Sequence, residues 1–440
     1  MNISDYKSVI EKAATYKHYG KVLRVVGLMI ESEGPAANIG EVCYIHSSSS
    51  NRPPIVSEVV GFNNEKILLM PYAEVTEIGS GCLVESTGKP LTVKVGRSLI
   101  GNVVNSLGQP LDDQASLPKG LSNYLTDQAP PNPMTRPPIR KPIQVGVKAI
   151  DSLLTMGKGQ RVGIFAGSGV GKSTLLGMIA RNSNADINVI ALIGERGREV
   201  REFIEHDLGE EGLKKTIVVA ATSDQPALMR IKGAYTATAI SEYFRDLGYH
   251  VNLMMDSVTR VAMAQREIGL AIGEPPTTKG YTPSVFSILP KLLERTGTNK
   301  AGTITAFYTV LVDGDDMNEP IADAVRGILD GHFVMDRKLA ERGQFPAINV
   351  QKSVSRVMNM VATAEQKQIA QELRKLMAVY EDNRELINIG AYKRGTNQEI
   401  DRSISYYPKI QEFLRQDIHE VNTLEETIQL MKSLLNGGIE

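Results

Sequence analysis

The stretch GIFAGSGVGKSTLLGMI, residues 163–179, joins a short apolar run, three glycines at alternate positions, a lysine, two hydroxyl residues and an apolar helical segment. Glycines let successive backbone N–H groups turn toward one point, and a helix that begins directly after them adds its positive end. The lysine supplies a fixed cation for terminal phosphates, and the hydroxyl that follows it can bind Mg²⁺. The stretch therefore predicts a polyphosphate site on a loop between a strand and a helix.

Within this loop, Lys172 is expected to contact the β- and γ-phosphates, and Ser173 is expected to bind Mg²⁺. The usual pattern begins with glycine, whereas this chain has Ala166. Alanine indicates that this position does not require a positive φ, so the predicted nest of N–H groups is unaffected. The predicted phosphate-binding residues are Gly167, Ser168, Gly169, Val170, Gly171, Lys172, Ser173 and Thr174.

Apolar strand-like runs alternate with helical segments around this loop, among them INVIALIG, TIVVAAT, VNLMMD and TITAFYTVLV. The alternation predicts an α/β domain with a parallel sheet and helices on both faces, and such sheets bind ligands at the carboxyl ends of their strands. Asp256 ends one run and suits a carboxylate that binds Mg²⁺ through water. Glu195 directly follows another run and is placed to orient the attacking water. The alternative for each acid alone is a solvated residue at a strand end.

The chain divides into four segments. Residues 1–17 have an apolar face at helical spacing, which predicts an amphipathic helix that either caps the next domain or docks a partner. Short β-rich runs separated by turn residues predict a β-barrel over 18–96. Residues 97–360 hold the parallel-sheet domain and include a proline-rich strap, 129–142, which cannot continue a helix or a central strand. Residues 361–440 are predicted to form a helical domain.

Two helix starts in the last segment are predicted from capping boxes. Thr396 is followed by Glu399, and Thr423 is followed by Glu426, each in front of an amphipathic run. In a capping box the hydroxyl and the carboxylate each accept a hydrogen bond from the other residue's backbone N–H. We therefore expect one helix to begin after each threonine.

Composition narrows the class of protein. Hydrophobic residues make up 42% of the chain and charged residues 22%, which is typical of a globular protein, and the formal net charge of -1 gives no global basic field for nucleic acid. The distant cysteines Cys43 and Cys82 and the scattered histidines predict neither a disulfide nor a zinc site. Without an apolar leader or a stretch of about 18 uncharged apolar residues, we expect a cytoplasmic protein.

Five motifs, GSGVGKST, GERGRE, MMDSVTR, GYTPSVFSILPKLLERTG and SVSRV, resemble the F-type and V-type rotary ATPases. They are most similar to the flagellar and type III secretion export ATPases, and the likeness covers nearly the whole chain. It implies a RecA-like P-loop core between an N-terminal β-barrel and a C-terminal helical domain, with ATP and Mg²⁺ as ligands. It also implies that Glu195 is the catalytic base, Asp256 the Mg²⁺-associated acid, and Arg196 and Arg260 neighbours of the γ-phosphate. Family loops commonly start with alanine, as at Ala166.

The stretch GQFPAINVQKSVSRVMNMV, residues 343–361, resembles two different chains of rotary synthases. The FPA-like part is typical of the catalytic chain, which implies that Phe345 stacks on adenine. The SVSRV part is typical of the partner chain, which implies that Arg356 is an arginine finger for a neighbour's γ-phosphate. A core phenylalanine and a surface ion pair are the alternatives. Tyr392 is a weaker candidate for another wall of the adenine pocket.

A chain with both the base and the finger predicts a homo-oligomeric ring, and the resemblance makes it a hexamer. The resemblance implies an ATPase that energises flagellar protein export and helps chaperone-bound substrates unfold at a membrane gate. Virulence secretion is an alternative, although GYTPSVF looks more like the flagellar branch. A rotary synthase subunit is another, but the tail lacks the acidic run typical of synthase catalytic chains.

Two further classes of function receive less support. An RNA motor that resembles the Rho helicase would need a basic, aromatic-rich surface, and this chain has no tryptophan and 5% aromatic residues. A nucleotide-gated scaffold without hydrolysis is disfavoured by Glu195. The implied partners are therefore stator and central-stalk proteins, the export gate and chaperone–substrate complexes rather than nucleic acid. The implied location is the cytoplasm, peripheral to the inner face of the cell membrane.

Overall fold

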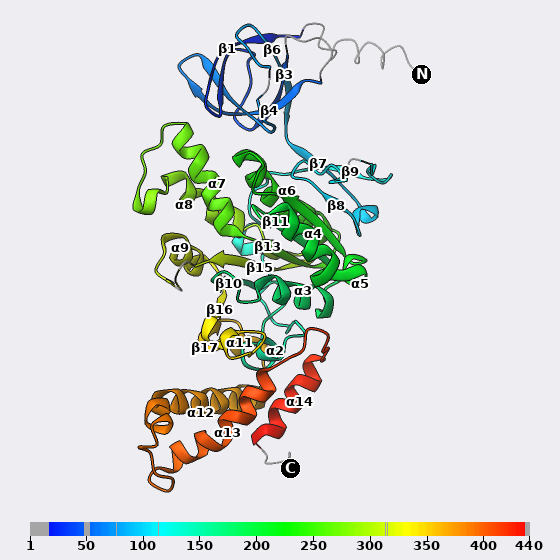
Figure 1. Cartoon of the computed structure of the whole chain (residues 1–440). Helices are drawn as coiled ribbons and strands as arrows, with labels where there is room; N and C mark the ends of the chain where they lie inside the picture. The colour runs from blue at the N-terminus through cyan, green and yellow to red at the C-terminus, as the bar shows by residue number, and fades with distance from the viewer. Residues whose placement is uncertain are drawn as a thin grey trace.

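Three regions follow one another along the long axis of the computed structural model, with the β-barrel at one end and a group of helices at the other (Figure 1). The structure describes residues 17–47, 53–75, 77–112, 114–312, 314 and 316–435. The helix predicted over residues 1–17 lies outside the described residues, except for its last position. The predicted architecture of a β-barrel, an α/β core and a helical C-terminal region is confirmed.

The first region is a closed antiparallel barrel of six strands in the order β1-β2-β5-β4-β3-β6. Alternate residues of each strand point inward, and a small core that includes Ile30, Cys43 and Val59 fills the barrel. Closure leaves no unpaired edge, because every strand has two neighbours. The strands are β1 (Tyr19–Val26), β2 (Met29–Glu33), β3 (Glu41–His46), β4 (Ile55–Asn63), β5 (Lys66–Pro71) and β6 (Leu83–Pro90).

A buried ion pair joins the barrel to the core. Lys232 Nζ donates to Glu58 Oε1 at 2.8 Å, and the Tyr72 hydroxyl donates to the same carboxylate. Burial strips water from both charges, so removing one partner leaves the other uncompensated at a cost of about 3–5 kcal/mol. The barrel is therefore held to the core by charged as well as apolar contacts.

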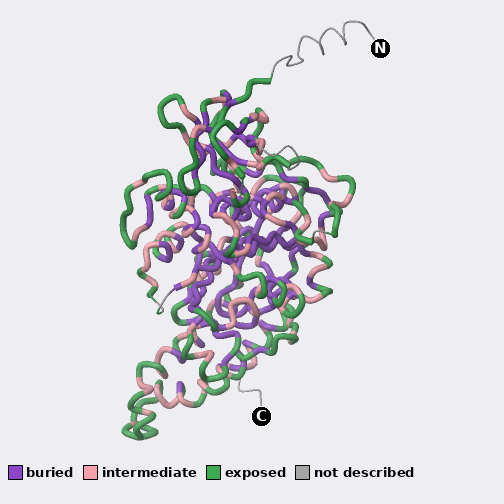
Figure 2. The backbone as a smooth tube through the Cα atoms, turned by 45° about the horizontal axis from the view of Figure 1, so that its top comes forward, coloured by how far each residue is buried: buried purple, intermediate pink, exposed green. Residues whose placement is uncertain are grey.

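The core is a sheet with the strand order β17-β16-β10-β15-β13-β11-β12-β8, in which β17 runs antiparallel to β16 and β14 is added antiparallel to β15. Successive residues of β11 enter different cores: Val189 and Ala191 pack on one face of the sheet, and Ile190 and Leu192 pack on the other. Helices cover both faces, so the central strands are mostly apolar on both faces. Figure 2 shows the buried residues concentrated in this sheet.

A two-stranded ribbon, β7 and β9, connects the barrel to the core and precedes the strap, which has a 3₁₀ turn at Pro133–Thr135. The strands of the ribbon and the core are β7 (Thr92–Val95), β8 (Val103–Val104), β9 (Ser122–Leu125), β10 (Arg161–Ala166), β11 (Ile187–Ile193), β12 (Thr216–Ala221), β13 (His250–Asp256), β14 (Gly297–Thr298), β15 (Thr303–Leu311), β16 (Gly331–Met335) and β17 (Ile348–Ser355). The helices are α2 (Lys148–Leu153), α3 (Lys172–Asn182), α4 (Gly197–Glu202), the π-helical η3 (Phe203–Leu208), α5 (Gly209–Leu213), α6 (Ala227–Asp246), α7 (Val258–Ala271), α8 (Pro283–Leu293), α9 (Pro320–Ile328), α10 (Arg337–Glu341) and α11 (Met358–Val361).

The last region consists of α12 (Ala364–Asn388), α13 (Gln398–Leu414) and α14 (Leu424–Leu435). The capping box at Thr423 and Glu426 is confirmed, because each residue's side chain accepts from the other's backbone N–H. The box at Thr396 is wrong: Asn397 caps α13, and its side-chain oxygen accepts from Glu399 N at 2.9 Å. Within the described ranges, none of the helices combines the length and the apolar character needed to cross a membrane.

Candidate functional site

The glycine-rich loop lies between β10 and α3, at the carboxyl end of the sheet, where it lines a cleft of about 520 Å³. Gly169 and Gly171 have φ values of 76° and 88°, which side-chain-bearing residues rarely adopt, and Gly171 is the N-cap of α3. The first N–H groups of α3 therefore point toward the cleft without helical partners. Arg337 of α10 donates to Ser168 O at 3.0 Å and holds the outer side of the loop, a contact that the sequence did not indicate.

Three predicted residues meet at the floor of this cleft. Lys172 Nζ lies 3.4 Å from Glu195 Oε1 and also donates to the Asp256 carboxylate. The Thr309 hydroxyl of β15 donates to Asp256 Oδ1 at 2.7 Å. Burial alone would lower the pKa of Lys172, but the charges of Asp256 and Glu195 raise it above its ordinary value. Lys172 is therefore a fixed cation that two carboxylates hold at the mouth of the loop.

A second carboxyl group, Glu199, lies against Glu195. Burial, with help from the Asp256 charge and a hydrogen bond to Glu199, raises the pKa of Glu195 to about 7, and the Lys172 charge opposes that rise. A carboxyl group with a pKa near neutrality suits a general base, because it can accept a proton at physiological pH. Our sequence reasoning did not select Glu199, although its place four residues after Glu195, in the first turn of a helix, was a usable signal.

Two arginines reach the cleft from its outer side. Gly194 has a φ of 71°, and a Cβ added there would lie 2.9 Å from Arg260 Cγ, so the Arg260 side chain packs directly on this glycine. Arg260 Nε is buried and makes no hydrogen bond within the part of the chain that is described. Arg196 caps α4 and is exposed, with an ion pair of 3.5 Å to Glu199. Both lie where an anion in the cleft would meet them.

Phe345 stands beside the glycine-rich loop. A Cβ added at Gly171 would lie 3.7 Å from Phe345 Cδ1, and the aromatic side chain is 45% exposed. The linker between α13 and α14 also reaches Phe345, because Gln416 N donates to Phe345 O at 2.9 Å. An exposed ring next to the loop can stack on a nucleotide's adenine. The linker that contains Gln416 also carries an exposed apolar residue, Ile418.

Tyr392 is not brought to this cleft, which corrects the expectation that it forms part of the adenine pocket. It lies in the turn between α12 and α13, at the outer tip of the helical region (Figure 1). Its hydroxyl donates to Asn397 O at 2.9 Å and contacts the Asp401 carboxylate. The two long helices carry the turn away from the sheet, so the linker at Gln416 contacts Phe345 instead.

Arg356 lies at the opposite end of β10 from the glycine-rich loop. Its backbone N–H donates to Asp330 O at 3.1 Å, and Asp330 N donates to Arg161 O at the first residue of β10. Arg161 and Gly167 are six positions apart, and at about 3.3 Å per residue this stretch spans about 20 Å. The structure therefore does not bring Arg356 together with Lys172 and Glu195 of the same chain.

The groups in and around the cleft include hydrogen-bond donors and oxygen ligands that suit a magnesium nucleotide. Backbone N–H groups, Lys172 and the unpartnered Arg260 Nε are donors for phosphate oxygens. The Ser173 hydroxyl lines the cleft, and the Asp256 carboxylate is buried beside Lys172. Both are oxygen ligands of the kind that Mg²⁺ takes. Val170 is buried in the core, so only its backbone can contribute.

Comparison with known proteins agrees with this geometry. Models of the ATP synthase alpha/beta family match residues 22–88 as its beta-barrel domain and 146–355 as its nucleotide-binding domain, and a T3SS EscN ATPase C-terminal domain model matches 362–433. The chain is 66% identical to the flagellum-specific ATP synthase of Bacillus subtilis, over 97% of each chain. It is 47% identical to a type 3 secretion system ATPase of Xanthomonas euvesicatoria, over 97% of this chain and 96% of that one.

Solved structures show the same fold. The assembled ATPase EscN of the enteropathogenic E. coli type III secretion system has a TM-score of 0.89 and 45% identity, and the match covers 94% of this chain and all of that one. EscN in complex with its central stalk EscO has a TM-score of 0.88, with the same identity and coverage. The RecA-like class implied by the sequence motifs is confirmed. The chain belongs to the ATP synthase alpha/beta family, in the branch of flagellum-specific ATP synthases and type 3 secretion ATPases, and it is an ATPase of that branch.

Proposed function

We propose that this chain hydrolyses Mg·ATP at the interfaces of a homo-oligomeric ring and thereby energises flagellar protein export. One observation carries the proposal: Lys172, Glu195 and Asp256 meet in one cleft, whereas Arg356 projects at the far end of β10. The cleft supplies phosphate donors and a base. Arg356 supplies the arginine finger that the cleft of a neighbouring subunit would otherwise lack.

In the hydrolytic step, Glu195 orients a water molecule and accepts its proton as the water oxygen attacks the γ-phosphorus. The bond between the γ-phosphorus and the bridging oxygen breaks, and the products are ADP and phosphate. Lys172 and the loop N–H groups stabilise the charge on the phosphate oxygens. Burial of Glu195 raises its pKa to about 7, which keeps the carboxyl group able to accept a proton near neutral pH.

Mg²⁺ would be held by the Ser173 hydroxyl and, through water, by Asp256. When bound, Mg²⁺ neutralises charge on the β- and γ-phosphates. Thr309 fixes Asp256 Oδ1 with a hydrogen bond of 2.7 Å, so this carboxylate has little freedom to turn away. Phe345 would stack on adenine, and Arg196 and Arg260 would lie near the γ-phosphate.

Distance supports action of Arg356 in trans. Arg356 lies about 20 Å along β10 from the loop of its own chain, which is too far for an arginine side chain to span. In a head-to-tail ring, each subunit would present its Arg356 to the cleft of the next subunit. We propose a hexamer, and the assembled state named for EscN supports a ring.

The same relatives support the choice of process and partners. The match to a flagellum-specific ATP synthase at 66% identity favours flagellar export over virulence secretion, which is the second candidate. The complex of EscN with its central stalk EscO supports a stalk protein as a partner. We extend the partners to stator proteins, the export gate and chaperone–substrate complexes, on the cytoplasmic face of the membrane. A rotary synthase subunit is disfavoured, because this chain has both halves of the site.

Mixed rings test the proposal. Arg356→Ala and Glu195→Gln chains are each expected to be inactive, and about a quarter of the interfaces in an equal mixture pair an intact cleft with an intact finger. Hydrolysis should reappear in the mixture. Native mass measurement or crosslinking must show that mixed rings form. Mixed rings that stay as inactive as the separate variants would refute action in trans.

The cellular role has its own test. A strain without this gene should lack flagellar filaments, and the wild-type chain should restore them. The Glu195→Gln chain should fail to restore them although it is present at the same level. Filaments in the deletion strain would refute the flagellar assignment and leave the enzymatic proposal intact.

A further inference from the structure

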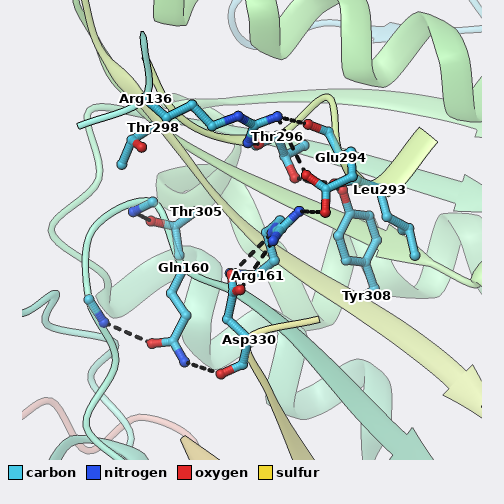
Figure 3. A network of polar contacts seen from close by, with 12 residues as sticks. Arg136, Gln160, Arg161, Leu293, Glu294, Thr296, Thr298, Thr305, Tyr308 and Asp330 are labelled. Atoms are coloured by element: carbon cyan, nitrogen blue, oxygen red, sulfur yellow. Dashed lines mark hydrogen bonds and ion pairs between the residues drawn. The ribbon is translucent and has the colours of Figure 1, made fainter. Parts of the chain in front are cut away.

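A polar network surrounds the amino end of β10, with Arg161 at its centre (Figure 3). Arg161 Nε and Nη2 donate to Asp330 Oδ2 and Oδ1 at 3.0 and 3.1 Å, the two-pronged geometry in which such pairs are strongest. Arg161 N also donates to Asp330 Oδ2, and Asp330 N donates to Arg161 O. Four hydrogen bonds therefore join these two residues. On its other side, Arg161 Nη1 lies 2.6 Å from Glu294 Oε1.

The Asp330 backbone carbonyl connects this network to Arg356. It accepts from Arg356 N at 3.1 Å and from Gln160 Nε2 at 3.1 Å. Gln160 Nε2 also donates to the Ser355 hydroxyl at 3.1 Å. Both Ser355 and Arg356 are therefore bonded to groups that are fixed at the start of β10.

The strands β16 and β17 pack closely at this point. A Cβ added at Gly331 would lie 2.5 Å from Val354 O, so β17 leaves no space for a side chain there, and Gly331 pairs with Ser355 across the two strands. The Arg356 side chain differs from its backbone: it is exposed, and its described contact is a hydrogen bond of 3.4 Å from Nη2 to Arg326 O. The Arg356 backbone is thus held in place, and its guanidinium group is exposed.

We infer that Asp330 is a positioning residue for Arg356: clamped by Arg161, its carbonyl fixes the backbone from which Arg356 projects toward a neighbouring subunit's cleft. The inference rests on the proposed function of Arg356. A catalytic group needs support that holds it to about 0.5 Å, and displacement by about 1 Å can cost about 10²-fold in rate. Asp330 provides that support without touching the nucleotide of its own chain.

Sorting variants by their behaviour in mixed rings tests this inference. Asp330→Asn keeps the shape of the side chain but loses the charge that holds Arg161, and turnover should fall by about 10²-fold. Its own cleft should bind an ATP analogue normally. Mixed with Glu195→Gln chains, which have an intact finger, it should regain activity. Mixed with Arg356→Ala chains, which also lack a working finger, it should not.

Glu294→Gln is the matched control, because Glu294 contacts the same arginine but not the Arg356 backbone. It should keep most of the wild-type turnover. If Asp330→Asn unfolds, Ser355→Ala removes the other attachment and should show the same mixing behaviour with a smaller loss.

Three results would overturn the inference: wild-type turnover of Asp330→Asn, recovery with Arg356→Ala chains, or no recovery with either partner. If the Arg356→Ala and Glu195→Gln pair itself gives no activity, the proposed function fails rather than this inference alone.

Discussion

The two ends of β10 differ in how their positive charges are balanced. At the carboxyl end, Lys172 contacts the carboxylates of Glu195 and Asp256 within its own chain. At the amino end, Arg161 is paired with Asp330 and Glu294, but the neighbouring Arg356 has no carboxylate partner among the described residues. An arginine whose backbone is held by hydrogen bonds and whose side chain has no counter-ion is suited to bind a negative charge from outside the chain. The difference supports the proposal that one subunit carries two half-sites that face different neighbours.

The largest expected effect concerns Arg356, at the amino end of β10. Arg356→Ala should lower the turnover number by about 10³–10⁵-fold, because an arginine finger acts on charge that develops in the transition state. Nucleotide affinity should change little. Arg356→Lys should recover only part of the loss, since lysine lacks the planar fork. Steady-state hydrolysis measures turnover, and equilibrium binding measures nucleotide affinity. Arg394→Ala, on the exposed α12–α13 turn, is the control variant. Turnover of Arg356→Ala near the wild-type value would contradict the comparison.

The next effect concerns the carboxyl end of β10, where two carboxylates balance the charge of Lys172. Glu195→Gln should lower turnover by about 10²–10⁴-fold, because the amide keeps the shape of the side chain but cannot accept a proton. Mg·ATP should still bind. Lys172→Ala should weaken binding as well as turnover, since the lysine contacts phosphates in the ground state. Comparing nucleotide affinity with turnover separates the two roles, and a Glu195→Gln enzyme with near wild-type turnover would remove Glu195 from the mechanism.

A moderate effect is expected at Phe345, where adenine would stack. Phe345→Ala should weaken nucleotide binding by about 1–3 kcal/mol, or from about fivefold to about 150-fold, which is the usual contribution of stacking. Phe345→Tyr should keep most of the affinity because the ring remains. Tyr392→Ala serves as the matched aromatic control, since its turn lies away from the cleft. Equal losses in the Phe345→Ala and Tyr392→Ala variants would show that the measured change does not report stacking.

The smallest effect is a shift in pH dependence. Glu195 accepts a proton only when ionised, and its pKa of about 7 predicts that kcat/KM falls as the pH drops below about 7. A hydrogen bond and the charge of Glu199 are among the causes that raise this pKa, so Glu199→Gln should move the midpoint to a more acidic pH. Glu202→Gln, on the same helix but paired with Arg198, is the control. An unchanged midpoint in Glu199→Gln would show that Glu199 does not set this pKa.

Sequence reasoning succeeded where neighbouring residues decide the outcome. The glycine-rich loop adopts the positive φ values that its glycines permit, and the capping box at Thr423 forms because its two partners are three residues apart. The start of α13 was misplaced by one residue, because Asn397 competes with Thr396 for the same role. Such local competition between two good caps is not resolved by pattern alone.

Short-range patterns were enough to predict the succession of barrel, parallel-sheet core and helices, together with a glycine-rich loop from Gly167 to Thr174 between a strand and a helix. These features depend on alternation, glycine freedom and helix periodicity, all of which act over a few residues. Three-dimensional packing sets three features that the local patterns did not predict: Glu199 lies beside Glu195, Tyr392 lies away from the cleft, and Asp330 lies between Arg161 and Arg356. Arg161 and Asp330 are 169 residues apart in the chain, and what brings them together is the order in which the strands assemble. Strand order depends on long-range packing, which no short stretch of sequence contains.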